Sequence, residues 1–191
     1  MQRLTGIDCL RGLALVGMTI FHFSYDLGQL SFIDFSLSDP FWKVFRASIV
    51  TVFCFCVGYS FRIALDARKP WKAMLKRISV ISSWALAITL TSLILIPEKY
   101  VYFGILHFIA LSTLLLFFIA KYRWVCLSIS LIIWIGWGYF GWAMSWLFNF
   151  LQPALHLSNN PLDVTHFIPW FASVTFGSFI AGMSIAQERT S

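Results

Sequence analysis

The sequence carries little charge. Only 12% of its 191 residues are Asp, Glu, Lys or Arg, whereas soluble domains carry roughly 25%. Hydrophobic residues make up 59% of the chain, and its mean hydropathy is +0.79. Several apolar stretches reach the roughly 20 residues that cross a bilayer. The composition therefore excludes an ordinary water-soluble domain and predicts an integral membrane protein.

Several kinds of motif are also missing from the sequence. It has no Walker loop and no dinucleotide fingerprint. Its four histidines show no metal-ligand spacing such as His-x₃-His, so no metal is expected. The four cysteines (9, 54, 56 and 126) all lie in apolar segments, which excludes an extracellular disulfide framework and favours buried structural thiols.

Acidic residues are fewer than basic ones, which gives a net charge of +6. Six of the 14 basic residues fall between residues 62 and 77. A cluster beside apolar segments favours a cytoplasmic loop that obeys the positive-inside rule over a nucleic-acid surface. No nucleic-acid partner is therefore expected.

Hydropathy predicts an all-α, polytopic helical bundle of about six transmembrane helices that forms a single domain over residues 1–191. The stretch 136–142, "GWGYFGW", is typical of a kink or an interfacial collar. If the N-terminus is cytoplasmic, 11 Lys and Arg residues fall inside and three outside, so both termini are predicted to be cytoplasmic. The predicted spans are residues 7–26, 42–64, 78–96, 102–120, 124–147 and 166–186.

The first span carries Asp8, Arg11, His22 and Asp26, although ionisable groups are costly inside a membrane. At 100° per residue, Arg11 and His22 lie within about 20° of each other around the helix and about 16 Å apart along it. Asp8 can pair with Arg11 and Asp26 with His22, since these spacings bring side chains together on a helix. We expect this stripe to face protein or a water-filled cavity.

Other interpretations of these residues stay open. Asp8 and Arg11 also suit an interfacial helix start, and a lone His22 also suits a polar contact between helices. A histidine oriented by a carboxylate, however, is the unit used for general-base catalysis near neutral pH. All four histidines (22, 107, 156 and 166) fall on the predicted outer half, where Arg46 also lies. The combination favours a catalytic site.

Three blocks of the sequence resemble one family. "RLTGIDCLRGLALVGMTIFHFSYDL", "FGILHFIALSTLLL" and "FIPWFASVTFGSFIAGM" are similar to the catalytic-domain family of heparan-alpha-glucosaminide N-acetyltransferase, within the wider transmembrane acyltransferase group. Asp163 and Pro169-Trp170 fit the pattern that usually precedes the family's last helix, whereas Val164 and His166 depart from it. The blocks lie in separate parts of the chain and together cover nearly all of it.

The resemblance implies transfer of an acetyl group from acetyl-CoA to an amine or hydroxyl of an envelope sugar or glycolipid in a bacterial inner membrane. His22 would act as general base with Asp26 behind it, and His107 or Arg46 would stabilise the oxyanion or position the acceptor. Direct transfer and an acyl-His22 intermediate both stay open, and a homodimer is allowed. The implied donor-binding residues are Asp8, Arg11 and Arg62, and the implied acceptor-binding residues are Tyr25, Asp163 and Trp170.

Two other functions fit the same residues. Intramembrane His, Asp and Arg also mark ion paths, so a small transporter or proton-coupled channel is one alternative. The short chain also suits a non-catalytic membrane subunit. In the first span the ionisable groups collect toward the two ends, whereas a transporter tends to place them near the bilayer midplane.

Overall fold

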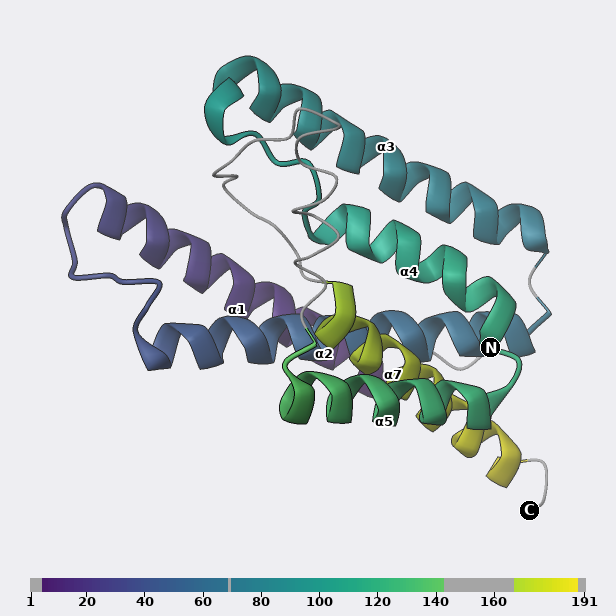
Figure 1. The fold of residues 1–191 in the computed structure, drawn as a ribbon. Helices are drawn as coiled ribbons and strands as arrows, with labels where there is room; N and C mark the ends of the chain where they lie inside the picture. Colours follow the sequence, from purple (N-terminus) through teal and green to yellow (C-terminus); the bar gives the residue numbers. More distant parts are fainter. Residues whose placement is uncertain (1–4, 69, 143–166, 189–191) are drawn as a thin grey trace.

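The computed structural model of the chain describes residues 5–68, 70–142 and 167–188. These residues form six α-helices and one short 3₁₀ turn, with no strand among them (Figure 1). The all-helical prediction is confirmed. The elements are α1 (Thr5–Gln29), α2 (Pro40–Asp66), α3 (Trp71–Leu95), η1 (Pro97–Lys99), α4 (Ile105–Ile119), α5 (Arg123–Phe140) and α7 (Phe167–Glu188).

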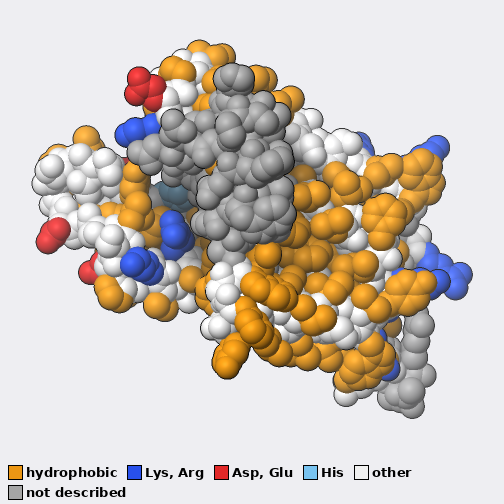
Figure 2. All heavy atoms as spheres, viewed as in Figure 1, with side chains coloured by type: hydrophobic (Ala, Val, Ile, Leu, Met, Phe, Trp, Pro, Cys, Tyr) orange, Lys and Arg blue, Asp and Glu red, His pale blue; other side chains and the backbone are white. Residues whose placement is uncertain are grey.

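Five of these helices (α1, α2, α3, α5 and α7) are long and apolar enough to cross a membrane. The shorter apolar α4 has 15 residues, which corresponds to about 22 Å against a hydrocarbon core of about 30 Å. Many large apolar side chains are exposed, such as Ile94 (78%) and Phe23 (63%). Figure 2 shows hydrophobic side chains over much of the visible surface. Such a surface is suited to lipid, so the chain is an integral membrane protein.

Most helix ends differ from the predicted spans by a few residues, and three differences bear on the fold. The helix expected over 78–96 begins at Trp71, so the last part of the predicted basic loop is helical. Charged residues at a helix start lower the hydropathy of the sequence there but do not stop the helix. The helix expected over 102–120 covers only Ile105–Ile119.

The third difference concerns "GWGYFGW". Helix α5 continues through Gly136 and Gly138, and Gly141 follows its last residue with a left-handed φ of +64°. A glycine at this position is a common helix terminator because it has no Cβ to clash. The stretch therefore ends α5, and the rest of the predicted span lies outside the described residues.

The prediction that all four cysteines are buried is partly wrong. Cys9 is exposed, whereas Cys54, Cys56 and Cys126 are buried.

Helix α2 is the centre of the bundle, with α1, α4 and α7 packed against it. Helix α7 also packs on α5, and α3 lies against α4 (Figure 1). Helix α1 shares contacts with α2 alone among the described helices. The main core forms between α2, α4 and α7 and includes Val57, Phe61, Phe108, Leu116 and Val174. Most of the surface of α1 is therefore left uncovered within the described chain.

The helices alternate in direction, as a chain that crosses a membrane repeatedly requires. Phe21 near the end of α1 meets Trp42 near the start of α2, with ring centroids 6.1 Å apart. The side chain of Arg62 near the end of α2 reaches the carbonyl of Ala120 after α4. We call the end of the bundle that holds Arg11 and Arg62 the basic end, and the opposite end, which holds His22 and His107, the histidine end.

Candidate functional site at the histidine end

His22 and Asp26 lie on the exposed side of α1 in its last two turns. The neighbouring Phe21 is buried against α2, and the His22 ring contacts it edge-on at 5.8 Å. The structure gives no hydrogen bond between the side chains of His22 and Asp26. The imidazole ring of His22 thus contacts one aromatic ring and is otherwise accessible.

The predicted stripe from Arg11 to His22 lies along the edge of the α1–α2 interface. Arg11 and Met18 are half-buried, while Leu15 is 52% exposed. The buried face of α1 is rotated from this stripe and runs through Ala14 and Phe21. Within the described chain, protein covers the stripe partly at Arg11 and at Met18, and leaves Leu15 and His22 exposed.

Tyr25 and Arg46 lie close to the depth of His22. Tyr25 is half-buried, with its ring perpendicular to that of Phe35 at 5.8 Å. Arg46 is exposed on α2, one helical turn after Trp42, which packs on Phe21. Arg46 and His22 therefore come from two paired helices at a similar height.

His107 is held differently, because both of its ring nitrogens already have partners. Nδ1 accepts a hydrogen bond from the backbone N–H of Gly104 at 3.3 Å. Nε2 therefore carries the proton and donates to Oγ1 of Thr89 at 3.2 Å, and Thr89 donates to the carbonyl of Val101 at 2.8 Å. His107 thus ties the start of α4 to α3. Helices α1 and α4 share no contacts, so His22 and His107 do not touch.

An open groove of about 440 Å³ lies at this end, along the first turns of α2, and is lined by Pro40, Phe41, Val44, Phe45 and Ser48. Its lining comes from one helix, so it is a surface groove and not an enclosed site.

At the basic end, the predicted ion pair between Arg11 and Asp8 is present, at 3.0 Å between Nη1 and Oδ1. Nη2 of Arg11 also donates to Oγ of Ser60 in α2, at 2.6 Å. Side chains on a helix lean toward its N-terminus, so the guanidinium of Arg11 extends along α1 toward the basic end of the bundle. The sequence does not predict this contact, because a serine within a span carries no sign of its partner.

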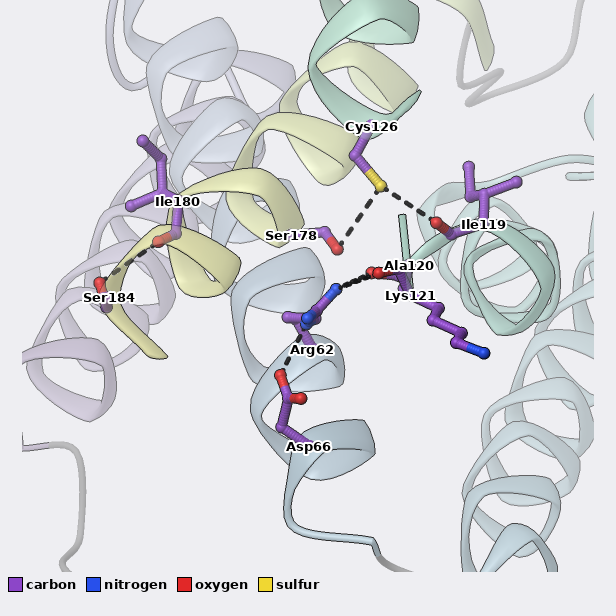
Figure 3. A network of polar contacts seen from close by, with 9 residues as sticks. All are labelled: Arg62, Asp66, Ile119, Ala120, Lys121, Cys126, Ser178, Ile180 and Ser184. Atoms are coloured by element: carbon purple, nitrogen blue, oxygen red, sulfur yellow. Dashed lines mark hydrogen bonds and ion pairs between the residues drawn. The ribbon is translucent and has the colours of Figure 1, made fainter. Parts of the chain in front are cut away.

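The guanidinium of Arg62 is hydrogen-bonded to other groups of the protein (Figure 3). Its Nε donates to Oδ2 of Asp66 at 2.7 Å, and its Nη1 donates to the carbonyls of Ala120 and Lys121. These carbonyls follow α4 at its C-terminal end, where backbone acceptors lack helical partners and positive charge is favourable. Arg62 therefore holds the ends of α2 and α4 together.

Arg11 and Arg62 do not line the opening of one shared ligand site. The partner of Arg11 on α2 is Ser60, which lies two residues before Arg62. Two residues turn a helix by about 200°, so Ser60 and Arg62 point to opposite sides of α2. The predicted pairing of the two arginines around one ligand finds no support in this arrangement.

Of the predicted acceptor-binding residues on the last helix, Trp170 is half-buried and packs against the main core. Asp163, together with His156 and His166, lies outside the described residues. Among the residues that are described, no group of three His, Cys, Asp or Glu side chains could hold a metal ion.

The arrangement has an exposed histidine on a membrane helix, one turn from a carboxylate, and an arginine at the other end of the same helix. The whole chain, over residues 3–191, matches the family model described as "Heparan-alpha-glucosaminide N-acetyltransferase, catalytic". The chain belongs to this family. No curated protein and no solved structure matches it.

Membership gives the protein the general character of a membrane acetyltransferase of the heparan-alpha-glucosaminide N-acetyltransferase family. Against that background the two described histidines have different environments. His22 is exposed, while His107 is bound through both nitrogens. Of the two, His22 is the one able to act as a base without first giving up a structural contact.

Proposed function

We propose that the protein transfers an acetyl group from acetyl-CoA to an amine or hydroxyl of an envelope sugar or glycolipid, in a bacterial inner membrane, with His22 as the general base. The observation that carries the proposal is the exposed His22 on α1, one turn from Asp26, in a chain that matches the acetyltransferase family from end to end. A neutral imidazole is the side chain best suited to remove a proton near pH 7.

In the proposed reaction, the acceptor oxygen or nitrogen attacks the thioester carbonyl carbon while His22 takes its proton. Asp26 stabilises the imidazolium electrostatically, because a carboxylate one helical turn away lies within reach of it. The carbon–sulfur bond then breaks, and His22 returns the proton to the sulfur of coenzyme A. Arg46 is the candidate to stabilise the oxyanion or position the acceptor, since it lies about one helical turn from the depth of His22 on the neighbouring helix.

The proposal gives His107 and Arg62 scaffold roles. Their polar atoms are bonded to Gly104 and Thr89 in one case, and to Asp66 and the end of α4 in the other. Arg11 remains the candidate for contact with the phosphates of the donor, held in place by Asp8 and Ser60. The distribution of Lys and Arg supports a cytoplasmic basic end and an outward histidine end.

The test is acetyl transfer from radiolabelled acetyl-CoA to a panel of amino sugars and glycolipids, with protein purified in detergent. His22→Ala should lower kcat by about 10²–10⁴-fold, the usual contribution of a placed base. Gln29→Ala, an exposed change at the end of the same helix, should keep full activity.

Three results would overturn the proposal. The first is normal acetyl transfer by the folded His22→Ala protein. The second is solute flux in proteoliposomes that needs no coenzyme A, which would indicate a transporter. The third is absence of any acyl transfer by the intact protein with every acceptor in the panel, which would indicate a non-catalytic subunit.

A further inference from the structure

A cavity of about 130 Å³ lies at the basic end, between α2, α3 and α4. Helix α3 packs against α4, while its backbone stays apart from that of α2, so the cavity occupies the space where α2 and α3 diverge. It lies apart from His22, which belongs to the opposite end of α1. Its walls are formed by Phe61, Ala64, Ala73, Met74, Arg77 and Thr113.

Arg77 is the one charged residue in this lining. Its side chain is exposed while it also lines the cavity, so it stands at the mouth. In the described part of the chain no ion pair joins it to a carboxylate, and the acidic residues at this end, Asp8 and Asp66, bind Arg11 and Arg62. The mouth therefore has positive charge without a neutralising partner, which favours a bound anion.

The surroundings of Arg77 narrow the chemistry of that anion. A guanidinium at an apolar cavity matches a phosphate bidentately, while the apolar walls suit a hydrocarbon chain. A cavity of about 150 Å³ holds one benzene molecule, so this one has room for about five or six heavy atoms. That is enough for a short stretch of hydrocarbon next to the phosphate, but a nucleotide base would have to lie outside.

We propose that this cavity is the binding site of an amphiphilic phosphate ester, with the phosphate on Arg77 at the mouth and the apolar carbons next to it inside the cavity. The ligand is either an anionic phospholipid of the surrounding leaflet or a soluble phosphate ester with a flexible arm. Arg77 lies in the second turn of α3, about 10 Å along the helix from its start. This depth is suited to the headgroup level of the bilayer. The site is separate from His22 and stands whether or not His22 transfers an acyl group.

General attraction between basic residues and anionic lipid is the competing explanation, since Lys72 and Lys76 lie on the same two turns. Lys76 offers a matched control. It is exposed, it neighbours Arg77 in the sequence, and it does not line the cavity. If general electrostatic attraction binds the lipid, removing the charge of Lys76 or of Arg77 should weaken lipid binding equally. If the cavity is a specific binding site, only the loss of Arg77 should weaken it.

The test measures lipid bound to the intact protein by native mass spectrometry after exposure to phosphatidylglycerol or phosphatidylcholine. Wild type and Lys76→Gln should retain phosphatidylglycerol, and Arg77→Gln should weaken its binding by about tenfold, the effect of about one lost charge-assisted bidentate contact. Ala73→Leu, which fills the cavity and keeps every charge, should weaken it too. Arg77→Lys should keep only part of the binding, because an ammonium cannot form the two parallel hydrogen bonds that a guanidinium makes to a phosphate.

A second arm identifies the source of the phosphate. Coenzyme A is titrated against the phosphatidylglycerol complex of the wild type and of Arg77→Gln. Displacement that depends on Arg77 assigns the cavity to a soluble ester, and retention of the lipid assigns it to a headgroup. Equal losses in Lys76→Gln and Arg77→Gln, or unchanged binding in Ala73→Leu and Arg77→Gln with unchanged Tm, would overturn the proposal.

Discussion

Gly58 of α2 lies directly against the backbone of Val174 in α7. A Cβ atom added to this glycine would overlap with the carbonyl oxygen of Val174. The contact is reciprocal, because a Cβ on Gly177 of α7 would overlap with the carbonyl of Phe55 in α2. Two glycines thus let the central pair of helices cross with their backbones touching, as small residues do in membrane bundles.

The first prediction concerns this crossing. Gly58→Ala and Gly177→Ala should each destabilise the bundle by more than the ~1–3 kcal/mol of ordinary overpacking, because the obstacle is backbone and not a side chain that can rotate. The thermal unfolding of the purified protein and the fraction that elutes as a single species would measure the loss.

Gly12→Ala in α1 and Gly138→Ala in α5 are the matched controls, since a Cβ at either position meets nothing within 4 Å. They should be neutral or slightly stabilising, by about 0.5–1 kcal/mol, the ordinary preference of a helix for Ala over Gly. Equal behaviour of all four variants would show that α2 and α7 do not cross at these glycines.

The second prediction separates the two described histidines. His107→Ala should lower stability by about 1–3 kcal/mol, because it leaves the N–H of Gly104 without its acceptor and removes the partner of Thr89. Thr89→Val should reproduce part of this loss. In the protein that remains folded, kcat should be close to that of the wild type.

His22→Ala should show the opposite pattern, with Tm nearly unchanged and acetyl transfer lost. Measured on the same preparations, kcat and Tm therefore distinguish a base from a structural histidine. A His107→Ala protein with wild-type stability and a large fall in kcat would move His107 into the catalytic site.

The helical membrane fold could be predicted from hydropathy, because a chain with so few charged residues must bury its backbone polar groups in helices. The start of α3 could not be predicted in this way. Trp71 to Arg77 is rich in positive charge, yet it is helical, since such residues extend into the headgroup region without breaking backbone hydrogen bonds. Hydropathy detects the apolar part of a helix and not its ends.

The site was predictable within one helix and not between helices. The Asp8–Arg11 pair follows from spacing alone, and the structure contains it. Arg62 pairs with Asp66 on its own helix, at a spacing the sequence shows, but its bonds to the end of α4 go to backbone carbonyls. His107 accepts from the backbone N–H of Gly104 and donates to Thr89 on α3. A sequence pattern does not reveal partners on another helix or in the backbone. Sequence alone therefore gave both residues a role in ligand chemistry, whereas in the structure their polar atoms are bonded to neighbouring groups of the protein.

The third prediction compares the two arginines at the basic end. Arg62→Gln should lower stability by about 2 kcal/mol, because Asp66 and the carbonyls after α4 lose a charged donor in a part-buried setting. Its KM for acetyl-CoA should stay near the wild-type value. Arg11→Gln should instead raise that KM with a smaller change in Tm.

Lys72→Gln, an exposed change at the same end, is the control for a general loss of positive charge. It should leave both Tm and KM unchanged. If Arg62→Gln raises the KM for acetyl-CoA while the protein keeps its stability, Arg62 belongs to the donor site after all and its bonds to α4 are given up on binding.

The fourth prediction concerns the polar contact between α5 and α7. Ser130 and Thr175 are both buried, and their hydroxyl oxygens lie 2.7 Å apart. Thr175 also reaches the carbonyls of Phe171 and Ala172 on its own helix. Since such bonds between membrane helices contribute about 0.6 kcal/mol on average and up to about 1.7, Ser130→Ala and Thr175→Val should each destabilise the protein by an amount in this range.

A double-mutant cycle gives the coupling directly. The loss in the Ser130→Ala/Thr175→Val double variant should be smaller than the two single losses added together, because both remove the same bond. Ser128→Ala, on an exposed position of α5, should have no effect. Strict additivity in the cycle would mean that the two hydroxyls do not bond to each other. Helix α5 would then be held to α7 by its other contacts, such as Ser130 Oγ to the carbonyl of Ala172 at 3.0 Å and Trp134 against Phe176 at 5.2 Å.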